Sequence, residues 1–251
     1  MPFSEASIYL SVVIPAYNEE RNIRESLRRI ESFMVLQKYD WECIVSSDGS
    51  KDRTVEWVND FVKTHPSGRF KLVSTEKNEG KGFTVRRGVL ASRGKFILVT
   101  DADLSAPIKE ADKLIGVLES GYDIAIGSRA VRTEGADVQQ SFKRRLAGRI
   151  FNFFVRTLVL KDFLDTQCGF KGFKQGAAQK LFGMQKLNGF SFDVEILYLA
   201  KKYGFKMKEV AVMWRQAPET HVRLVRDSFA MIKDLLKIRK LHSPESATHV
   251  S

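Results

Sequence analysis

The sequence predicts an α/β fold whose sheet is largely parallel, and two observations lead to this prediction. Short apolar, β-branched runs alternate with segments of helix length, and five such runs precede residue 130. Each run is followed at once by a polar segment rich in Gly, Asn, Asp, Lys or Arg. Strands that alternate with helices build a parallel sheet, and open sheets of this kind bind ligands beyond the carboxyl ends of their strands.

The first half of the chain supplies five expected strands and three helical segments. The strands are expected at residues 9–15, 41–47, 70–75, 95–101 and 123–128. The helical segments begin near Glu20 and near Asp52 and occupy residues 82–92. The polar segments that follow the strands read AYNEE, DGSKD, EKNEGKG, DADLSAP and GSRAV. They are expected together at one edge of the sheet, where their composition suits a phosphorylated ligand.

After residue 130 the alternation loosens, although we still expect one domain over residues 1–241. A basic, Phe-rich helix is expected at 142–160, a helix from Ser191, a strand at 206–214 and a final amphipathic helix at 222–241. The domain divides into halves of about 8–130 and 131–241, and the polar stretch 242–251 is expected to be a disordered tail.

The composition favours a globular protein with anionic partners. The 251 residues are 43% hydrophobic and carry a net charge of +11. Such a charge suits nucleic acid, phosphorylated small molecules or an acidic membrane surface. No nucleic-acid-binding motif occurs, and the basic residues are dispersed among acidic ones. We therefore expect no nucleic-acid partner.

Cysteine use and the N-terminal sequence indicate a cytoplasmic location. Cys43 and Cys168 lack the spacing of a zinc site or a disulfide framework. The segment MPFSEASIYL lacks the basic and apolar regions of a signal peptide, and no window approaches the ~18 apolar residues of a spanning helix.

Two aspartates follow the expected strand in KFILVTDADLSAP. If Asp101 and Asp103 continue the strand, they point to the same side about 7 Å apart. Their repulsion is then on the order of 2 kcal/mol, which a bound cation would relieve. Hard oxygen ligands with room for substrate phosphates suit Mg²⁺ or Mn²⁺. The plainer alternative is that Asp103 caps the next helix while Asp101 is a solvated strand end.

Eight motifs in order carry a resemblance to a known family. They are VVIPAYNEE, DGSKDRT, NEGKG, DADLSAP, GSR, DTQCGFKGF, FDVE and RDSFAMIKDLLKIR. Together, from about Leu10 to Arg239, they resemble the family 2 glycosyltransferases of GT-A fold, and more narrowly the polyprenyl-phosphate (dolichyl-phosphate) glucosyl and mannosyl transferases. The stretch DTQCGF looks more like the glucosyl branch. The resemblance implies a nucleotide-binding first half and an acceptor-binding second half.

The resemblance implies roles for residues of the first half in binding a nucleotide-sugar donor. Asp48 would contact uracil, although this chain has Ser47 where the family commonly carries a second aspartate; its alternative is an Asp-Gly turn. Tyr17 would lie near the base, or pack as a turn tyrosine on the following helix. The NEGKG segment would approach the nucleotide or be only a surface loop. The remaining implied donor-site residues are Pro15, Ala16, Glu19, Asn78, Lys81, Asp101 and Ala102.

The resemblance also implies an acceptor site in the second half. Arg129, Arg145 and Arg149 would bind the acceptor phosphate, for which the planar guanidinium is suited, although a basic run is normally a solvated face. Asp165 would act as a base or position the acceptor. Asp193 falls in the first turn of a helix and either serves the site or complements the helix dipole.

The implied reaction is the inverting transfer of a hexose, glucose from UDP-glucose in the first instance, to a polyprenyl or dolichyl monophosphate. Asp103, Asp165 and Arg129 are the implied catalytic residues, with Mg²⁺ or Mn²⁺ on Asp101 and Asp103. A phosphate monoester is mostly dianionic at pH 7, so a strong base is optional. GDP-mannose as donor, a soluble acceptor and a catalytically silent binding module are the alternatives. A loop holding His221 and Arg223 would fold over the diphosphate.

A lipid acceptor implies contact with an anionic membrane surface on its cytosolic face. The final helix carries Val225, Phe229, Ile232 and Leu236 at helical spacing among basic residues, so it would lie in the interface or dock on the domain's own core. Phe-rich residues 151–154 are a second candidate for lipid contact, and a separate membrane subunit is the alternative partner.

Overall fold

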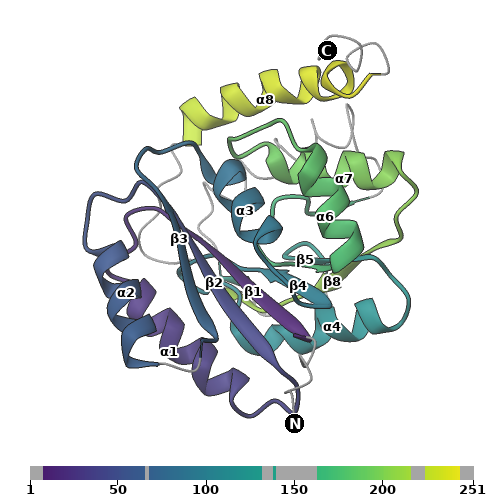
Figure 1. The fold of residues 1–251 in the computed structure, drawn as a ribbon. Coiled ribbons are helices and arrows are strands. Elements are labelled where there is room, and N and C mark those ends of the chain that lie inside the picture. The colour runs from purple at the N-terminus through teal and green to yellow at the C-terminus, as the bar shows by residue number, and fades with distance from the viewer. Residues whose placement is uncertain (1–7, 66–67, 132–137, 140–162, 216–223, 244–251) are drawn as a thin grey trace.

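In the computed structural model a seven-stranded sheet lies between two layers of helices (Figure 1). The structure describes residues 8–65, 68–131, 138–139, 163–215 and 224–243, without the side chains of 138–139 and 224–232. The strand order is β3-β2-β1-β4-β7-β5-β8. The sheet strands are β1 (Leu10–Ala16), β2 (Trp41–Asp48), β3 (Phe70–Thr75), β4 (Phe96–Val99), β5 (Ile124–Ser128), β7 (Lys171–Lys174) and β8 (Met207–Ala211).

The two faces of the sheet bury different sets of apolar side chains because successive residues of a strand point to opposite faces. Val12 and Ile14 of β1 join one core, whereas Val13 between them joins the other. The first core lies under α1 (Ile23–Met34), α2 (Thr54–Thr64) and α4 (Ala111–Glu119). The second lies under α3 (Lys81–Leu90), α6 (Gln175–Met184), α7 (Phe192–Lys202) and α8 (Leu224–Leu241).

The predicted α/β fold and its five strands are confirmed, and each strand boundary differs by at most two residues. The strand expected at 206–214 is divided into β8 and a short β9 (Trp214–Arg215), which pairs with β6 (Val138–Gln139). The expected helix at 142–160 lies outside the described residues.

Two of the described strands, β6 and β7, were not predicted, and β7 matters most for the site. β7 runs antiparallel between β4 and β5, with Lys171 opposite both Val99 and Ile126. Because β7 is antiparallel to β4 and β5, its amino end lies at the edge of the sheet where those two strands have their carboxyl ends. The segment 165–170 is thereby brought to the predicted ligand edge.

Candidate active site

The loops after β1 and β2 are joined by hydrogen bonds at the carboxyl edge of the sheet. The Asn18 N–H donates to Ser50 Oγ at 3.1 Å, and the Glu19 N–H donates to Thr54 Oγ1 at 2.7 Å. Pro15 and Ala16 are buried at the end of β1, and Tyr17 beside them is 36% exposed. These hydrogen bonds join the two loops into one continuous wall of the site. The nucleotide contacts expected of Tyr17 and Glu19 on this wall stay predictions.

Asp48 organises the NEGKG loop. Its buried carboxylate accepts hydrogen bonds from two consecutive backbone groups, the Glu79 N–H at 2.8 Å and the Gly80 N–H at 2.9 Å. Asp48 therefore does more than complete an Asp-Gly turn, because it fixes the start of α3. Its contact with a uracil base stays a prediction.

The two glycines of NEGKG allow a close approach of protein backbone. A Cβ on Gly80 would lie 2.5 Å from the Asn188 carbonyl oxygen, and Gly80 has a φ of 108°. A Cβ on Gly82 would lie 2.7 Å from the Leu187 carbonyl oxygen. The Gly82 N–H donates to the Asn188 oxygen at 2.7 Å. Loop 187–189 therefore packs against the backbone on both sides of Lys81. Asn78, at the start of NEGKG, is exposed.

Asp101 and Asp103 follow β4 on a turn and not on an extended strand. The strand ends at Val99, the Leu104 N–H donates to the Asp101 carbonyl oxygen at 3.1 Å, and Leu104 has a φ of 48°. The spacing expected from a continuing strand therefore does not apply. Asp103 does not cap the next helix either, because its carboxylate accepts the Ser105 N–H and hydroxyl, both at 2.9 Å.

The two aspartates differ in their surroundings. Asp101 Oδ1 lies 2.6 Å from Lys81 Nζ, so Asp101 is not a simple solvated strand end. Burial would raise the pKa of Asp101, but the Lys81 ammonium outweighs burial and holds that pKa below its usual value. The pKa of Asp103 is raised, first by burial and then by the charge of Asp101.

The donor atoms at this edge suit a hard divalent cation. Within the described residues no three His, Cys, Asp or Glu side chains form a complete metal cage. Mg²⁺ and similar ions need only one or two carboxylates when substrate phosphates complete their shell. Asp101 and Asp103 lie on one turn, and the hydrogen bonds described for the Asp103 carboxylate come from the neutral Ser105, so a cation shared with Asp101 would supply positive charge to both carboxylates. The residues present therefore fit such an ion.

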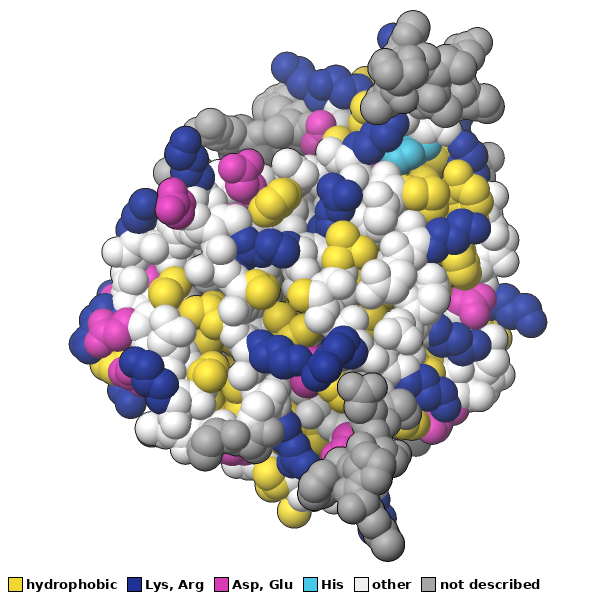
Figure 2. All heavy atoms as spheres, in the orientation of Figure 1, with side chains coloured by type: hydrophobic (Ala, Val, Ile, Leu, Met, Phe, Trp, Pro, Cys, Tyr) yellow, Lys and Arg dark blue, Asp and Glu magenta, His cyan; other side chains and the backbone are white. Residues whose placement is uncertain are grey.

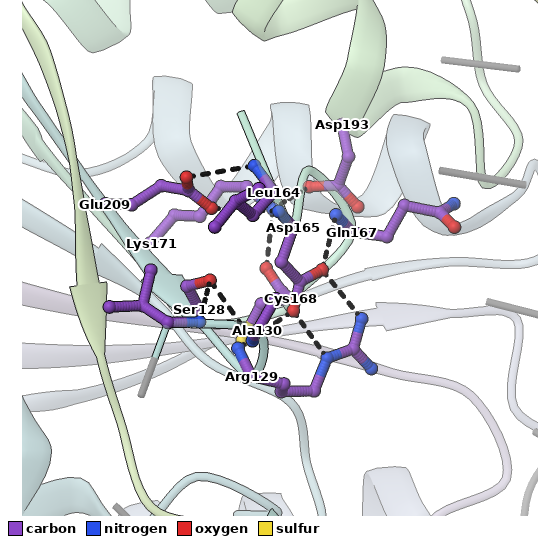
Figure 3. A network of polar contacts seen from close by, with 11 residues as sticks. Ser128, Arg129, Ala130, Leu164, Asp165, Gln167, Cys168, Lys171, Asp193 and Glu209 are labelled. Atoms are coloured by element: carbon purple, nitrogen blue, oxygen red, sulfur yellow. Dashed lines mark hydrogen bonds and ion pairs between the residues drawn. The ribbon is translucent and has the colours of Figure 1, made fainter. Parts of the chain in front are cut away.

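Arg129 and Asp165 form a two-bonded ion pair beside this site (Figure 3). Arg129 Nε and Nη2 donate to the two Asp165 oxygens at 2.7 and 2.9 Å, and the Arg129 N–H adds a third bond at 3.0 Å. Burial would raise the pKa of Asp165, but the guanidinium holds it below its usual value. Glu209 of β8 fixes the same segment, because it accepts the Leu164 and Asp165 N–H groups at 2.9 and 2.8 Å.

Lys171 and Asp193 form a second, deeply buried pair at 2.6 Å. Lys171 Nζ also donates a hydrogen bond to the Cys168 carbonyl oxygen at 2.5 Å, and this buried bond fixes the backbone of the DTQCGF segment (Figure 3). Burial raises the pKa of Asp193 despite the nearby ammonium. Asp193 is therefore part of the charged cluster and does not merely complement a helix dipole.

Comparison with known proteins identifies the family. The profile described as Glycosyl transferase family 2 matches residues 11–182. This chain belongs to glycosyl transferase family 2. It is 36% identical over 243 residues to a dolichyl-phosphate beta-glucosyltransferase of Dictyostelium discoideum, an alignment covering 93% of this chain and 74% of that one. The corresponding human protein is 34% identical over 245 residues, covering 92% and 74%.

Solved structures agree with the predicted GT-A type of fold. Glucosyl-3-phosphoglycerate synthase from Mycobacterium tuberculosis, in complex with UDP, superposes with a TM-score of 0.68 at 21% identity, covering 96% of this chain and 83% of that chain. The same enzyme has been crystallised with Mn²⁺ and UDP-glucose, and that structure superposes with a TM-score of 0.65 at 19% identity, covering 94% and 80%.

Several residues expected in this family 2 glycosyltransferase lie outside the described part of the chain. They are Arg145 and Arg149 of the acceptor site, the Phe-rich residues 151–154, and His221 and Arg223. The structure adds Lys171 and Glu209, which sequence reasoning did not single out. Their roles depend on β7 running antiparallel and on β8 lying beside β5, and no local pattern signals either arrangement.

The described end of α8 docks on the body of the glycosyltransferase. Leu235 and Ile238 are buried in the second core, and Ser191 Oγ donates to Asp234 Oδ2 at 2.9 Å. His242 Nε2 lies 2.6 Å from the buried Glu195. The disordered tail expected at 242–251 stays a prediction, because residues 244–251 lie outside the described part of the chain. The opposite side of α8 exposes Leu236 with basic residues, and Figure 2 shows Lys and Arg side chains over this helix at the top.

No described helix combines the length and the apolar character needed to cross a bilayer.

Proposed function

We propose that this chain transfers glucose from UDP-glucose to a polyprenyl or dolichyl monophosphate with inversion at the anomeric carbon. The observation that carries the proposal is the identity of 34–36% with dolichyl-phosphate beta-glucosyltransferases over more than nine-tenths of the chain. The site supports it, because a carboxylate pair suited to a donor cation lies beside an arginine suited to a phosphate.

Three loops bind different parts of the nucleotide-sugar donor. The wall at Pro15–Glu19 binds the nucleoside, with Asp48 behind it as the residue that orients the NEGKG loop. Asp101 and Asp103 would hold Mg²⁺ or Mn²⁺. When bound, that ion neutralises charge that develops on the departing diphosphate. Lys81 adds an ammonium to the same region.

On the acceptor side Arg129 binds the phosphate and Asp165 positions Arg129. A guanidinium has five N–H donors, and the side-chain pair with Asp165 uses two of them. The others are suited to phosphate oxygens. Asp165 is a poor general base, because its pKa is held low and both its oxygens already accept hydrogen bonds. A dianionic phosphate needs no base in any case.

A lipid acceptor requires that the protein reach a membrane surface, and we propose peripheral binding through basic residues of α8. Lys233, Lys237 and Lys240 are exposed on its described part, next to exposed Leu236. Each basic residue near an anionic surface contributes about 1 kcal/mol of binding free energy, so the attraction weakens with salt. A separate membrane subunit that presents the acceptor is the alternative partner.

Product analysis with defined substrates tests the proposal. The purified chain is incubated with labelled UDP-glucose, Mn²⁺ and polyprenyl phosphate in anionic liposomes, and parallel reactions contain GDP-mannose or a soluble phosphorylated acceptor. We expect glucose on the lipid, an inverted anomeric configuration and loss of transfer in Asp101→Asn/Asp103→Asn. Transfer only from GDP-mannose, or only to the soluble acceptor, would replace the proposed substrates.

A further inference from the structure

Lys81 lies at an unusual place for a cation. It is the first residue of α3, where the helix dipole is positive and a basic side chain is unfavourable. Its backbone is nevertheless fixed on both sides, because the Gly80 N–H donates to Asp48 and the Gly82 N–H donates to Asn188. The fixed loop therefore directs the Lys81 ammonium into the site, where Lys81 Nζ lies 2.6 Å from Asp101 Oδ1.

The other cations of the cluster already have partners. Arg129 is paired with Asp165 and Lys171 with Asp193. Among the residues that the structure describes, Asp101 and Asp103 are thus left to share Lys81, and the hydrogen bonds described for Asp103 come from Ser105, a neutral residue. The pair of carboxylates carries one negative charge more than the ammonium balances. A divalent cation would reverse this sign and leave one positive charge in excess.

The ammonium and a divalent cation compete for the same carboxylate. An ion held by Asp101 and Asp103 would be repelled by an ammonium 2.6 Å from Asp101 Oδ1. The ammonium has a flexible four-carbon stem and can leave. The diphosphate of a nucleotide donor supplies the negative charge that would receive it.

We infer that Lys81 is the resident counter-cation of Asp101, that a divalent cation displaces it, and that the released ammonium turns to the donor diphosphate. This inference rests on the proposed function for the identity of the donor. Lys81 thereby couples the binding of metal and nucleotide: the metal alone must expel the ammonium, whereas in the presence of nucleotide the ammonium gains a new partner. Such coupling is reciprocal, so nucleotide binding strengthens metal binding by the same factor that metal strengthens nucleotide binding.

The coupling is measured by titrating Mn²⁺, followed through the electron paramagnetic resonance of the free ion, without and with saturating UDP. In Lys81→Met we expect Mn²⁺ alone to bind about fivefold or more tightly than in wild type, and the gain on adding UDP to shrink. Lys81→Arg keeps the charge and is expected to keep weak binding of Mn²⁺ alone. Lys71→Met is the matched control, because Lys71 also pairs with a carboxylate, Glu42, at 2.7 Å but on another part of the sheet.

Two outcomes overturn the inference. One is that Lys81→Met binds Mn²⁺ alone no more tightly than wild type. The other is an unchanged UDP-dependent gain. Failure of the proposed function would look different, because wild type would then not bind UDP or not transfer glucose, while the titration with Mn²⁺ alone would still report on Lys81. Thermal unfolding of each variant shows that the compared proteins are folded.

Discussion

The carboxylate of Asp101 lies directly against the backbone of Gly169. A Cβ on Gly169 would be 2.2 Å from Asp101 Oδ2 and 2.6 Å from Asp101 Cγ. The DTQCGF segment therefore needs glycine at this position for a reason of packing, since any side chain would displace the carboxylate. The contact joins a loop after β4 to the segment before β7, which are 68 residues apart in the sequence.

Gly169→Ala is expected to displace the Asp101 carboxylate and weaken binding of Mn²⁺ with UDP by about tenfold, which corresponds to 1.4 kcal/mol. Calorimetric titration of the purified variant measures the change. Gly176→Ala is the control, because a Cβ there has no neighbour within 4 Å. It lies in α6, where alanine is favoured over glycine, so this control should keep wild-type affinity and gain slightly in thermal stability. Equal affinity in both variants would contradict the proposed role of the contact.

The variant Asp165→Asn distinguishes two roles for Asp165, that of positioning Arg129 and that of a general base. If Asp165 positions Arg129, the variant loses activity through a higher KM for the acceptor, and its remaining activity keeps the wild-type dependence on pH. If Asp165 were a base, the acidic limb of the pH profile would disappear. Arg129→Lys, which keeps the charge without the planar fork, should raise the same KM and leave the KM for donor unchanged.

Lys171→Met is expected to destabilise the fold by about 3 to 5 kcal/mol, because it leaves Asp193 buried without its partner. Combining it with Asp193→Asn should recover part of that loss, and a double-mutant cycle by chemical denaturation measures the coupling. Lys174→Met in the same strand is the control. Its pair with Asp123 is longer, at 3.4 Å, and more exposed, so the expected cost is below about 1 kcal/mol.

Glu195→Gln tests how loop 185–189 supports the donor site. The fully buried Glu195 carboxylate accepts hydrogen bonds from the Lys186 and Leu187 N–H groups, both at 2.9 Å. The carbonyl oxygen of the next residue, Asn188, accepts a hydrogen bond from the Gly82 N–H at the start of α3. Because an amide has one acceptor oxygen, the loop should loosen and the KM for donor should rise, with the KM for acceptor unchanged. Glu209→Gln makes the corresponding change on the acceptor side and should show the opposite pattern.

Stability in acid should depend on Glu42, which lies away from the site. Burial alone would raise its pKa, but hydrogen bonds from Lys71, Ser11 and the Arg93 N–H outweigh burial and lower it. A carboxyl whose pKa is depressed by folding contributes stability above its unfolded pKa of about 4.3, and that stability is lost as pH falls through the folded pKa.

In Glu42→Gln the melting temperature should be lower at pH 7 and should fall less steeply than that of wild type below about pH 4.3. The control is Glu25→Gln, an exposed residue whose described ion pair is with Arg29 on the same helix. A parallel acid response of Glu42→Gln and wild type would show that Glu42 does not control stability in this range.

The sequence predicted the outline of the fold because its strands carry local signals. Residues 70–75 were predicted as a strand with the observed bounds, and the helices after β1 and β2 begin within three residues of the expected positions. β7 was missed because its four residues, KGFK, contain two lysines and a glycine and show no apolar alternation. Its pairing between β4 and β5 comes from residues distant in the sequence.

The sequence by itself determined the family of this chain, because the order of its motifs indicated a family 2 glycosyltransferase and the profile match to residues 11–182 confirmed it. The aspartates and arginines were also visible in the sequence as candidate ligands. Tertiary structure alone decided which charges meet: Lys81 with Asp101, Arg129 with Asp165 and Lys171 with Asp193. The physical reason is that hydrophobic periodicity reports which side of a strand or helix is buried, whereas an ion pair depends on which elements become neighbours, and that is set by the packing of the whole sheet.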